Sequence, residues 1–184
     1  MEAFLVSTSL VALAEMGDKT QLLSLLLATR FRRPWPIVLG ILVATLLNHA
    51  LAAALGGSLR AWMGEQTLRW IVALGFVGMA VWVLIPDKLD ARAAPLGSRG
   101  VFATTAMAFF VAEMGDKTQI VTAALGTRYS ALFEVVLGTT VGMLLANVPV
   151  VFLGERFSAR LPMRLLRGIA AVSCVLLGAL VYFG

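Results

Sequence analysis

The sequence has few charged residues, a single cysteine and a single histidine. Charged residues make up 14% of the 184 residues and hydrophobic residues 60%, whereas a soluble domain usually carries about 25% charged residues. Folded in water, such a chain would expose a large apolar surface, so the composition predicts an integral membrane protein. The one cysteine excludes a disulfide within the chain.

Signatures of the common enzyme classes are also missing. The sequence has no H-E-x-x-H pair, no nucleophile elbow and no phosphate-binding loop. We therefore predict that the protein is not an enzyme and holds no prosthetic group. The net charge of +5 comes largely from arginines between apolar runs, which indicates membrane topology and not nucleic-acid binding.

Six apolar runs have about the length that spans a bilayer, ~20 residues. They lie at 3–28, 36–56, 68–86, 101–126, 133–154 and 165–183. The predicted fold is all-α, a polytopic membrane protein with six transmembrane helices in a single transmembrane domain, 1–184. The polar linker 87–99 separates a first repeat, 1–86, from a second, 100–184. The sequence leaves open whether the chain is a monomer or a homo-oligomer.

The two parts of the chain are copies of one another. The heptapeptide EMGDKTQ stands at 15–21 and again at 113–119, a spacing of 113 − 15 = 98 residues. The same shift places Val38-Leu39-Gly40 on Val136-Leu137-Gly138, without a gap from residue 4 to residue 85. This is an internal duplication. Because each copy holds three spans, the second must enter the membrane from the opposite side, which predicts two inverted three-helix repeats.

Positive residues between the spans predict the orientation. With the N-terminus outside, the inner loops hold ten lysines and arginines and the outer loops three. Since positive residues concentrate on the cytoplasmic side, both termini are predicted to lie outside and the linker 87–99 inside.

The repeated motif places charges inside predicted spans, where each costs about 2.5–3.5 kcal/mol at the bilayer centre. They must therefore face the interior of the helix bundle. In a continuous helix, Glu15 and Asp18 share a face, and Lys19 can reach back to Glu15. Gly17 permits close helix packing or local unwinding, which would free backbone carbonyls as ligands.

Brought together, the two motifs make a cation site with the metal ligands Glu15, Asp18, Glu113 and Asp116. With Lys19 and Lys117 the formal charge is −4 + 2 = −2, which one divalent cation or two protons would neutralise. Further oxygens come from Thr20, Gln21, Thr118 and Gln119. Protons and metal would compete for such a site, and this competition is the minimal design of an antiporter.

Three other readings of the motif remain open. Glu15–Lys19 and Glu113–Lys117 could be structural ion pairs within each motif. The protein could also be a divalent cation channel, which would show no proton coupling, or an exporter of another solute.

Polar residues also lie in the second and fifth spans. Asn48 and His49 are in the second span and Asn147 in the fifth, and the 98-residue shift places His49 on Asn147. They either form hydrogen bonds between helices or line the transport path. An imidazole would favour manganese over calcium, but the sequence alone does not make His49 a ligand.

The paired EMGDKTQ motifs, in a chain of three plus three predicted spans, resemble the Glu-x-Gly-Asp-(Lys/Arg)-(Thr/Ser) signature of the uncharacterised-protein-family-0016, or Gdt1, family. The resemblance covers nearly the whole chain. It implies a cation/proton antiporter that moves manganese or calcium, with Glu15, Asp18, Glu113 and Asp116 taking part in transport. The implied partners are divalent cations, protons and the lipid bilayer. The short chain is similar to bacterial members, which implies a place in the bacterial inner membrane.

Overall fold

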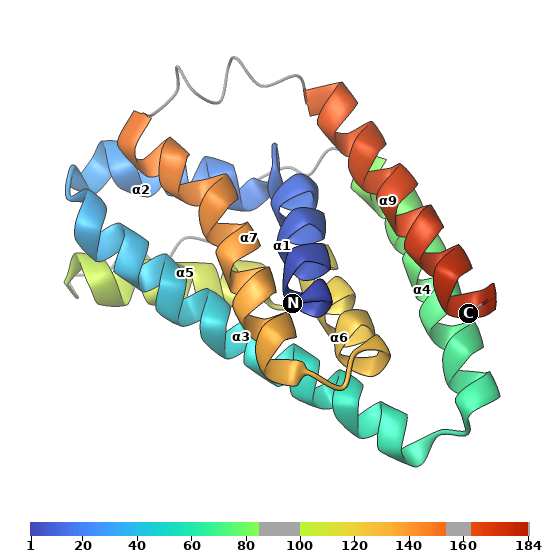
Figure 1. Cartoon of the computed structure of the whole chain (residues 1–184). Helices are drawn as coiled ribbons and strands as arrows, with labels where there is room; N and C mark the ends of the chain where they lie inside the picture. Colours follow the sequence, from blue (N-terminus) through green and yellow to red (C-terminus); the bar gives the residue numbers. More distant parts are fainter. Residues whose placement is uncertain (85–99, 154–162, 184) are drawn as a thin grey trace.

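The computed structural model describes residues 1–84, 100–153 and 163–183. Throughout these ranges the regular structure is helical, and no strand occurs in them (Figure 1). The helices within these ranges are α1 (Glu2–Glu15), α2 (Lys19–Phe31), α3 (Pro34–Trp62), α4 (Glu65–Leu84), α5 (Val101–Glu113), α6 (Lys117–Arg128), α7 (Leu132–Leu153) and α9 (Met163–Phe183). The predicted linker 87–99 lies outside the described residues.

The helix boundaries follow the duplication seen in the sequence. The starts of α2 and α6 are 98 residues apart (117 − 19), as are those of α3 and α7 (132 − 34) and of α4 and α9 (163 − 65). Each half therefore contains two short helices, then a long one, then a fourth. The inverted arrangement of the halves in a bilayer stays a prediction.

Two of the predicted spans are not continuous helices. The run at 3–28 is divided into α1 and α2, and the run at 101–126 into α5 and α6. The physical reason is the motif glycine, since Gly17 has φ 80° and Gly115 has φ 72°. This left-handed conformation is open to glycine and ends an α-helix.

Helices of one half pack on helices of the other. Helix α1 packs along α7, and its counterpart α5 packs along α3. A Cβ atom at Gly40 would lie 2.7 Å from the Cβ of Thr105, and one at Gly138 would lie 2.9 Å from the Cβ of Ser7. The two crossings use equivalent positions, because 40 + 98 = 138 and 7 + 98 = 105. Glycine at these sites lets the helix backbones approach closely, as in membrane helix pairs.

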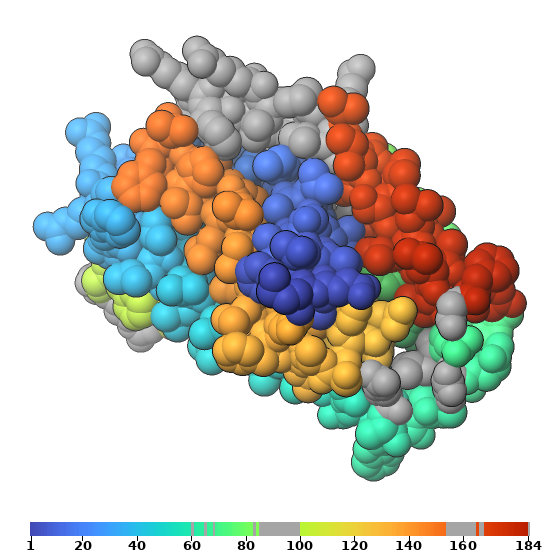
Figure 2. All heavy atoms as spheres, in the orientation of Figure 1, coloured from blue at the N-terminus to red at the C-terminus, as the bar shows by residue number. Residues whose placement is uncertain are grey.

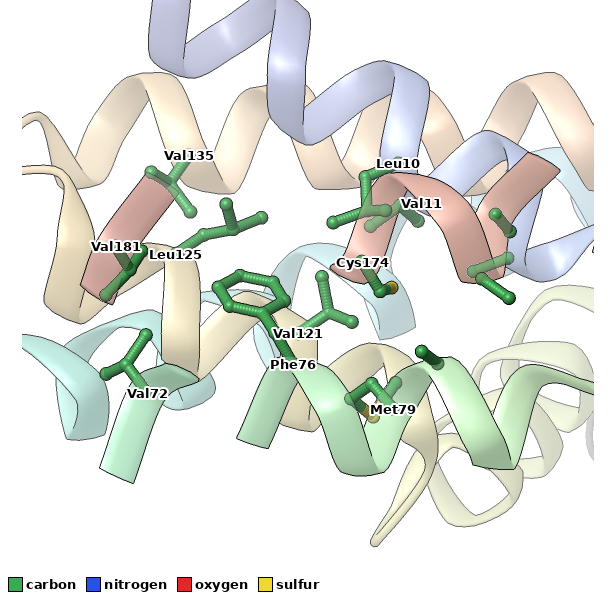
Figure 3. Packing of buried hydrophobic residues seen from close by; sticks show 14 of the residues in the cluster. Leu10, Val11, Val72, Phe76, Met79, Val121, Leu125, Val135, Cys174 and Val181 are labelled. Carbon is green, nitrogen blue, oxygen red and sulfur yellow. The ribbon is translucent and has the colours of Figure 1, made fainter. Parts of the chain in front are cut away.

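Helices α4 and α9 run antiparallel to one another at one side of the molecule (Figure 1). Helix α4 also contacts α6, and α9 contacts α1. Their inner faces join an apolar core in which Phe76 and Cys174 lie close to Leu10, Val11 and Val121 (Figure 3). This pair covers one flank of the bundle.

The outer surface of the bundle is largely apolar. Figure 2 shows one face, over α1, α7 and α9. On α9 alone, Val172, Leu176 and Leu180 are each about 60% exposed, with values of 60%, 59% and 63%. Two segments, Pro34–Leu59 and Leu132–Leu153, are long and apolar enough to cross a membrane. A polar interior under an apolar surface is the arrangement expected for a bundle surrounded by lipid.

Candidate cation-binding site

Each motif forms a short non-helical link between two helices, and the same hydrogen bonds hold both links. In the first, the Asp18 N–H donates to the Glu15 carbonyl oxygen at 3.1 Å, and the Gly17 N–H donates to Gln21 Oε1 at 2.9 Å. The corresponding distances in the second link are 3.0 Å and 2.9 Å. The glutamine that ends each motif therefore accepts a hydrogen bond from the motif glycine, at the point where the helix is interrupted.

The breaks place the acids at helix ends of opposite polarity. Asp18 and Asp116 are the N-cap residues of α2 and α6, where the helix dipole favours an anion. Glu15 and Glu113 are the last residues of α1 and α5, where the dipole disfavours one. The helix dipoles thus stabilise the charged form of the aspartates and destabilise that of the glutamates.

All four carboxylates are buried, with 0% exposure for both glutamates and 1% for both aspartates. Single carboxylate oxygens of Glu15, Asp18 and Asp116 lie within 4.8 Å of one another, close enough to share a metal ion. We call these three residues the three-acid group. Glu113 stands apart from the group, so the structure joins three of the four predicted ligands directly.

The ion pairs run from one motif to the other. Lys117 Nζ lies 2.5 Å from Asp18 Oδ1, and Lys19 Nζ lies 2.7 Å from Asp116 Oδ1. The helical spacing left open pairs within each motif, Glu15–Lys19 and Glu113–Lys117, as an alternative reading. The two pairs above run between the motifs, because the helix breaks between Glu15 and Lys19 and the other repeat places an aspartate beside each lysine.

Threonine hydroxyls contact the glutamates, but unequally in the two motifs. Thr20 Oγ1 donates to Glu15 Oε2 at 2.5 Å. Thr118 Oγ1 lies 3.4 Å from Glu113 Oε2 and 3.2 Å from Asp116 Oδ2. Within the described residues, the second oxygen of each glutamate is buried without a hydrogen-bond partner. Both glutamates therefore keep an oxygen available to a ligand.

The predicted polar residues of α3 lie beside the second motif. Asn48 Nδ2 donates to the Phe110 carbonyl oxygen at 3.1 Å, and Asn48 Oδ1 accepts from Gln119 Nε2 at 3.3 Å. His49 is fully buried, and its Nε2 lies 3.9 Å from Glu113 Oε2. Asn48 thus forms the expected hydrogen bond between helices, whereas His49 contacts an acid of the motif.

Asn147, on α7, lies beside α2. Its Oδ1 accepts from Ser24 Oγ at 2.8 Å, and its Nδ2 donates to the Met143 carbonyl oxygen at 3.1 Å. Gln21 Nε2 donates to the Ala146 carbonyl oxygen at 2.8 Å. Ser24 did not figure among the predicted residues, although its position three residues after Gln21, one helical turn, could have indicated it.

This buried charged centre, at the breaks of two discontinuous helices inside an apolar bundle, has the features of an ion-transporting membrane protein. The class is therefore a cation-transporting membrane protein.

The sequence model of the family described as "Divalent cation/proton antiporter GDT1" matches residues 3–91 and 101–184. The chain belongs to this family, which confirms the resemblance carried by the motifs. The chain is also 51% identical, over 172 residues, to a protein of Vibrio cholerae serotype O1 named "Putative manganese exporter". The alignment covers 93% of this chain and 86% of that relative. No solved structure matches the chain.

Proposed function

We propose that the protein exports a divalent cation, manganese and also calcium, in exchange for protons, through the site built from the two EMGDKTQ motifs. One observation carries the proposal: the two lysines pair with the two aspartates, and the charge of two fully buried glutamates is left over. The formal sum of the six groups is −2. One divalent cation or two protons cancel it.

The helix ends support a division of labour between the acids. The aspartates stand at positive helix ends with a lysine at each, so their charge is already compensated. The glutamates stand at negative helix ends, where an uncompensated anion is least stable. We infer that the glutamates take up the cation or the protons, while the aspartates complete the ligand set.

The three-acid group is the position proposed for the cation. Hard divalent ions take six or more oxygens, carboxylates above all. Glu15, Asp18 and Asp116 supply up to six carboxylate oxygens, some of them shared with the lysine ammonium groups. Thr20 and the backbone carbonyls at the helix breaks are further oxygens within the same segment.

Exchange follows from the cost of an empty site. Two uncompensated charges in an apolar bundle are unfavourable, so the empty, deprotonated site should not switch between inward-facing and outward-facing forms. The cation-loaded and doubly protonated forms are both near neutral. If only these two forms switch, each cation leaves as about two protons enter.

The arrangement in the membrane is proposed with the function. We propose six spans in two inverted repeats, with the broken helices α1–α2 and α5–α6 as the first and fourth spans. The positive loop residues support both termini on the outside, in a bacterial inner membrane.

Transport by purified protein in liposomes tests the proposal. Manganese, calcium and proton fluxes are measured together, with and without an imposed pH gradient. We expect acidity on the face that receives the cation to accelerate its movement, and protons to travel the other way. Equal cation flux with and without the gradient, and no proton flux, would identify a channel and refute the proposal. Empty liposomes and the double variant Glu15→Gln/Glu113→Gln are the controls.

A further inference from the structure

His49 is a buried polar side chain that the protein itself leaves unsatisfied. Its exposure is 0%, and neither ring nitrogen has a hydrogen-bond partner in the part of the chain that the structure describes. A buried polar group without a partner costs about 1–3 kcal/mol, so its presence calls for an explanation. The carboxylate oxygen Glu113 Oε2 lies 3.9 Å from Nε2, which is too far for a hydrogen bond.

Glu113 is unsatisfied in the same place. It is the acid outside the three-acid group, and its Oε1 has no hydrogen-bond partner among the described residues. Its Oε2 accepts a long hydrogen bond of 3.4 Å from Thr118. An unsatisfied imidazole therefore faces an undersatisfied carboxylate across a gap of 3.9 Å.

The gap has the right width for a metal ion. Zinc, a first-row transition metal, binds a histidine nitrogen at about 2.0–2.1 Å and a carboxylate oxygen at about 2.0–2.2 Å. A nitrogen and an oxygen on opposite sides of one such ion are then separated by up to about 4.3 Å. The observed 3.9 Å falls inside this limit, so His49 Nε2 and Glu113 Oε2 can bind one ion with little movement.

The other repeat shows that this feature is not a by-product of the duplication. The position equivalent to His49 is Asn147, since 49 + 98 = 147. Both polar atoms of the Asn147 side chain are hydrogen-bonded, to Ser24 and to Met143. One side of the site thus has a satisfied amide, and the other an imidazole with a free nitrogen.

We propose that His49 and Glu113 form a second cation position, beside the three-acid group, that selects first-row transition-metal ions over calcium and magnesium. Imidazole nitrogen suits transition metals, whereas calcium and magnesium favour oxygen ligands. The inference rests on the proposed function and adds a source of ion selectivity to it. Because the other proposed charged ligands are all carboxylates, His49 is the ligand that favours transition-metal ions over calcium and magnesium.

The first test uses the unaltered chain and its single histidine. Manganese is added to purified protein bearing a tag without histidine, and nitrogen coupling to the bound ion is measured by pulsed electron paramagnetic resonance. Coupling to an imidazole nitrogen is expected, and it can come only from His49. Bound manganese without such coupling would overturn the proposal, even if manganese–proton exchange is normal. Coupling without exchange would instead leave this position standing and refute the proposed function.

The second test is His49→Asn, which installs the residue that the fold already holds at Asn147. The KM for manganese should rise about tenfold or more, the loss found even for groups one step removed from a metal. The KM for calcium in the same preparation should rise by a smaller factor, so the ratio of the two KM values shifts against manganese, and the calcium transport that remains shows that the variant is folded. Equal changes for the two ions, or no change for manganese, would overturn the proposal. If the variant does not fold, the resonance measurement on the unaltered chain decides.

Discussion

Replacing Glu15 by glutamine should change the number of protons exchanged, and not only the rate. Glutamine has the shape of glutamate and can still accept from Thr20, whose hydroxyl lies 2.5 Å from Glu15 Oε2. The substitution removes one negative charge, so the formal charge of the site goes from −2 to −1. One proton then neutralises the empty site, while a bound divalent cation leaves it at +1.

The magnitude follows from this charge count. With two protons per cation, a pH difference of one unit supplies about 2.8 kcal/mol, a 100-fold cation gradient, and the membrane potential has no effect. With one proton per cation, the same pH difference supports only a tenfold gradient. One net charge then moves in each cycle, so 100 mV adds about 2.3 kcal/mol, a further factor of about 50.

The assay measures the final distribution of manganese across liposomes whose pH difference and potential are both set. The end point does not depend on turnover rate, so a slow variant is still informative. We expect the final manganese gradient to be independent of the membrane potential for the unaltered protein and to change with the potential for Glu15→Gln. Two outcomes would refute the assignment of the exchanged charge to the glutamates. One is a final gradient for Glu15→Gln that does not depend on the potential, and the other is a final gradient for the unaltered protein that does.

Three further predictions concern stability and topology. Lys117→Met should destabilise the protein by about 3–5 kcal/mol, because it leaves the buried Asp18 carboxylate without its lysine. Lys19→Met should destabilise it by less, because the Lys19 side chain is 25% exposed and that of Lys117 only 4%. Detergent-induced unfolding that ranks the two variants the other way would contradict the pairing. Gly115→Ala should cost about 1–2 kcal/mol from the backbone alone, since no atom of the described residues lies within 4 Å of the added Cβ. An unchanged free energy of unfolding would show that the left-handed turn is not required. Cysteines at the equivalent exposed positions Arg33 and Ala131 should react with impermeant reagents from opposite sides of the membrane, and labelling from one side would exclude inverted repeats.

The duplicated helix plan could be predicted from the sequence because it depends on spacing alone. A shift of 98 residues aligned the motifs, and the same shift relates the starts of α2 and α6. The break within each motif was only partly predictable. Gly17 indicated that unwinding was open to the chain, but whether a glycine bends, packs or ends a helix depends on the neighbours that stabilise it, here the Gln21 side chain.

The partners of the charged residues could not be predicted from spacing. A separation of four residues favours Glu15–Lys19 in an isolated helix, but Lys19 pairs with Asp116 because another helix brings that aspartate within 2.7 Å. The contact between His49 and Glu113 likewise joins α3 to the end of α5. Residue types indicated the kind of site, whereas the pairing of its members depends on how the two halves meet.

The exchanged lysines make each half of the chain the counterion of the other. Lys117 compensates Asp18, and Lys19 compensates Asp116, so one half alone would hold a lysine and an aspartate without these partners. A chain with a single motif would therefore need a second copy to form these two ion pairs. Because the two copies here belong to one chain, equivalent positions can differ, and the histidine at 49 against the asparagine at 147 is a difference that two identical subunits could not have.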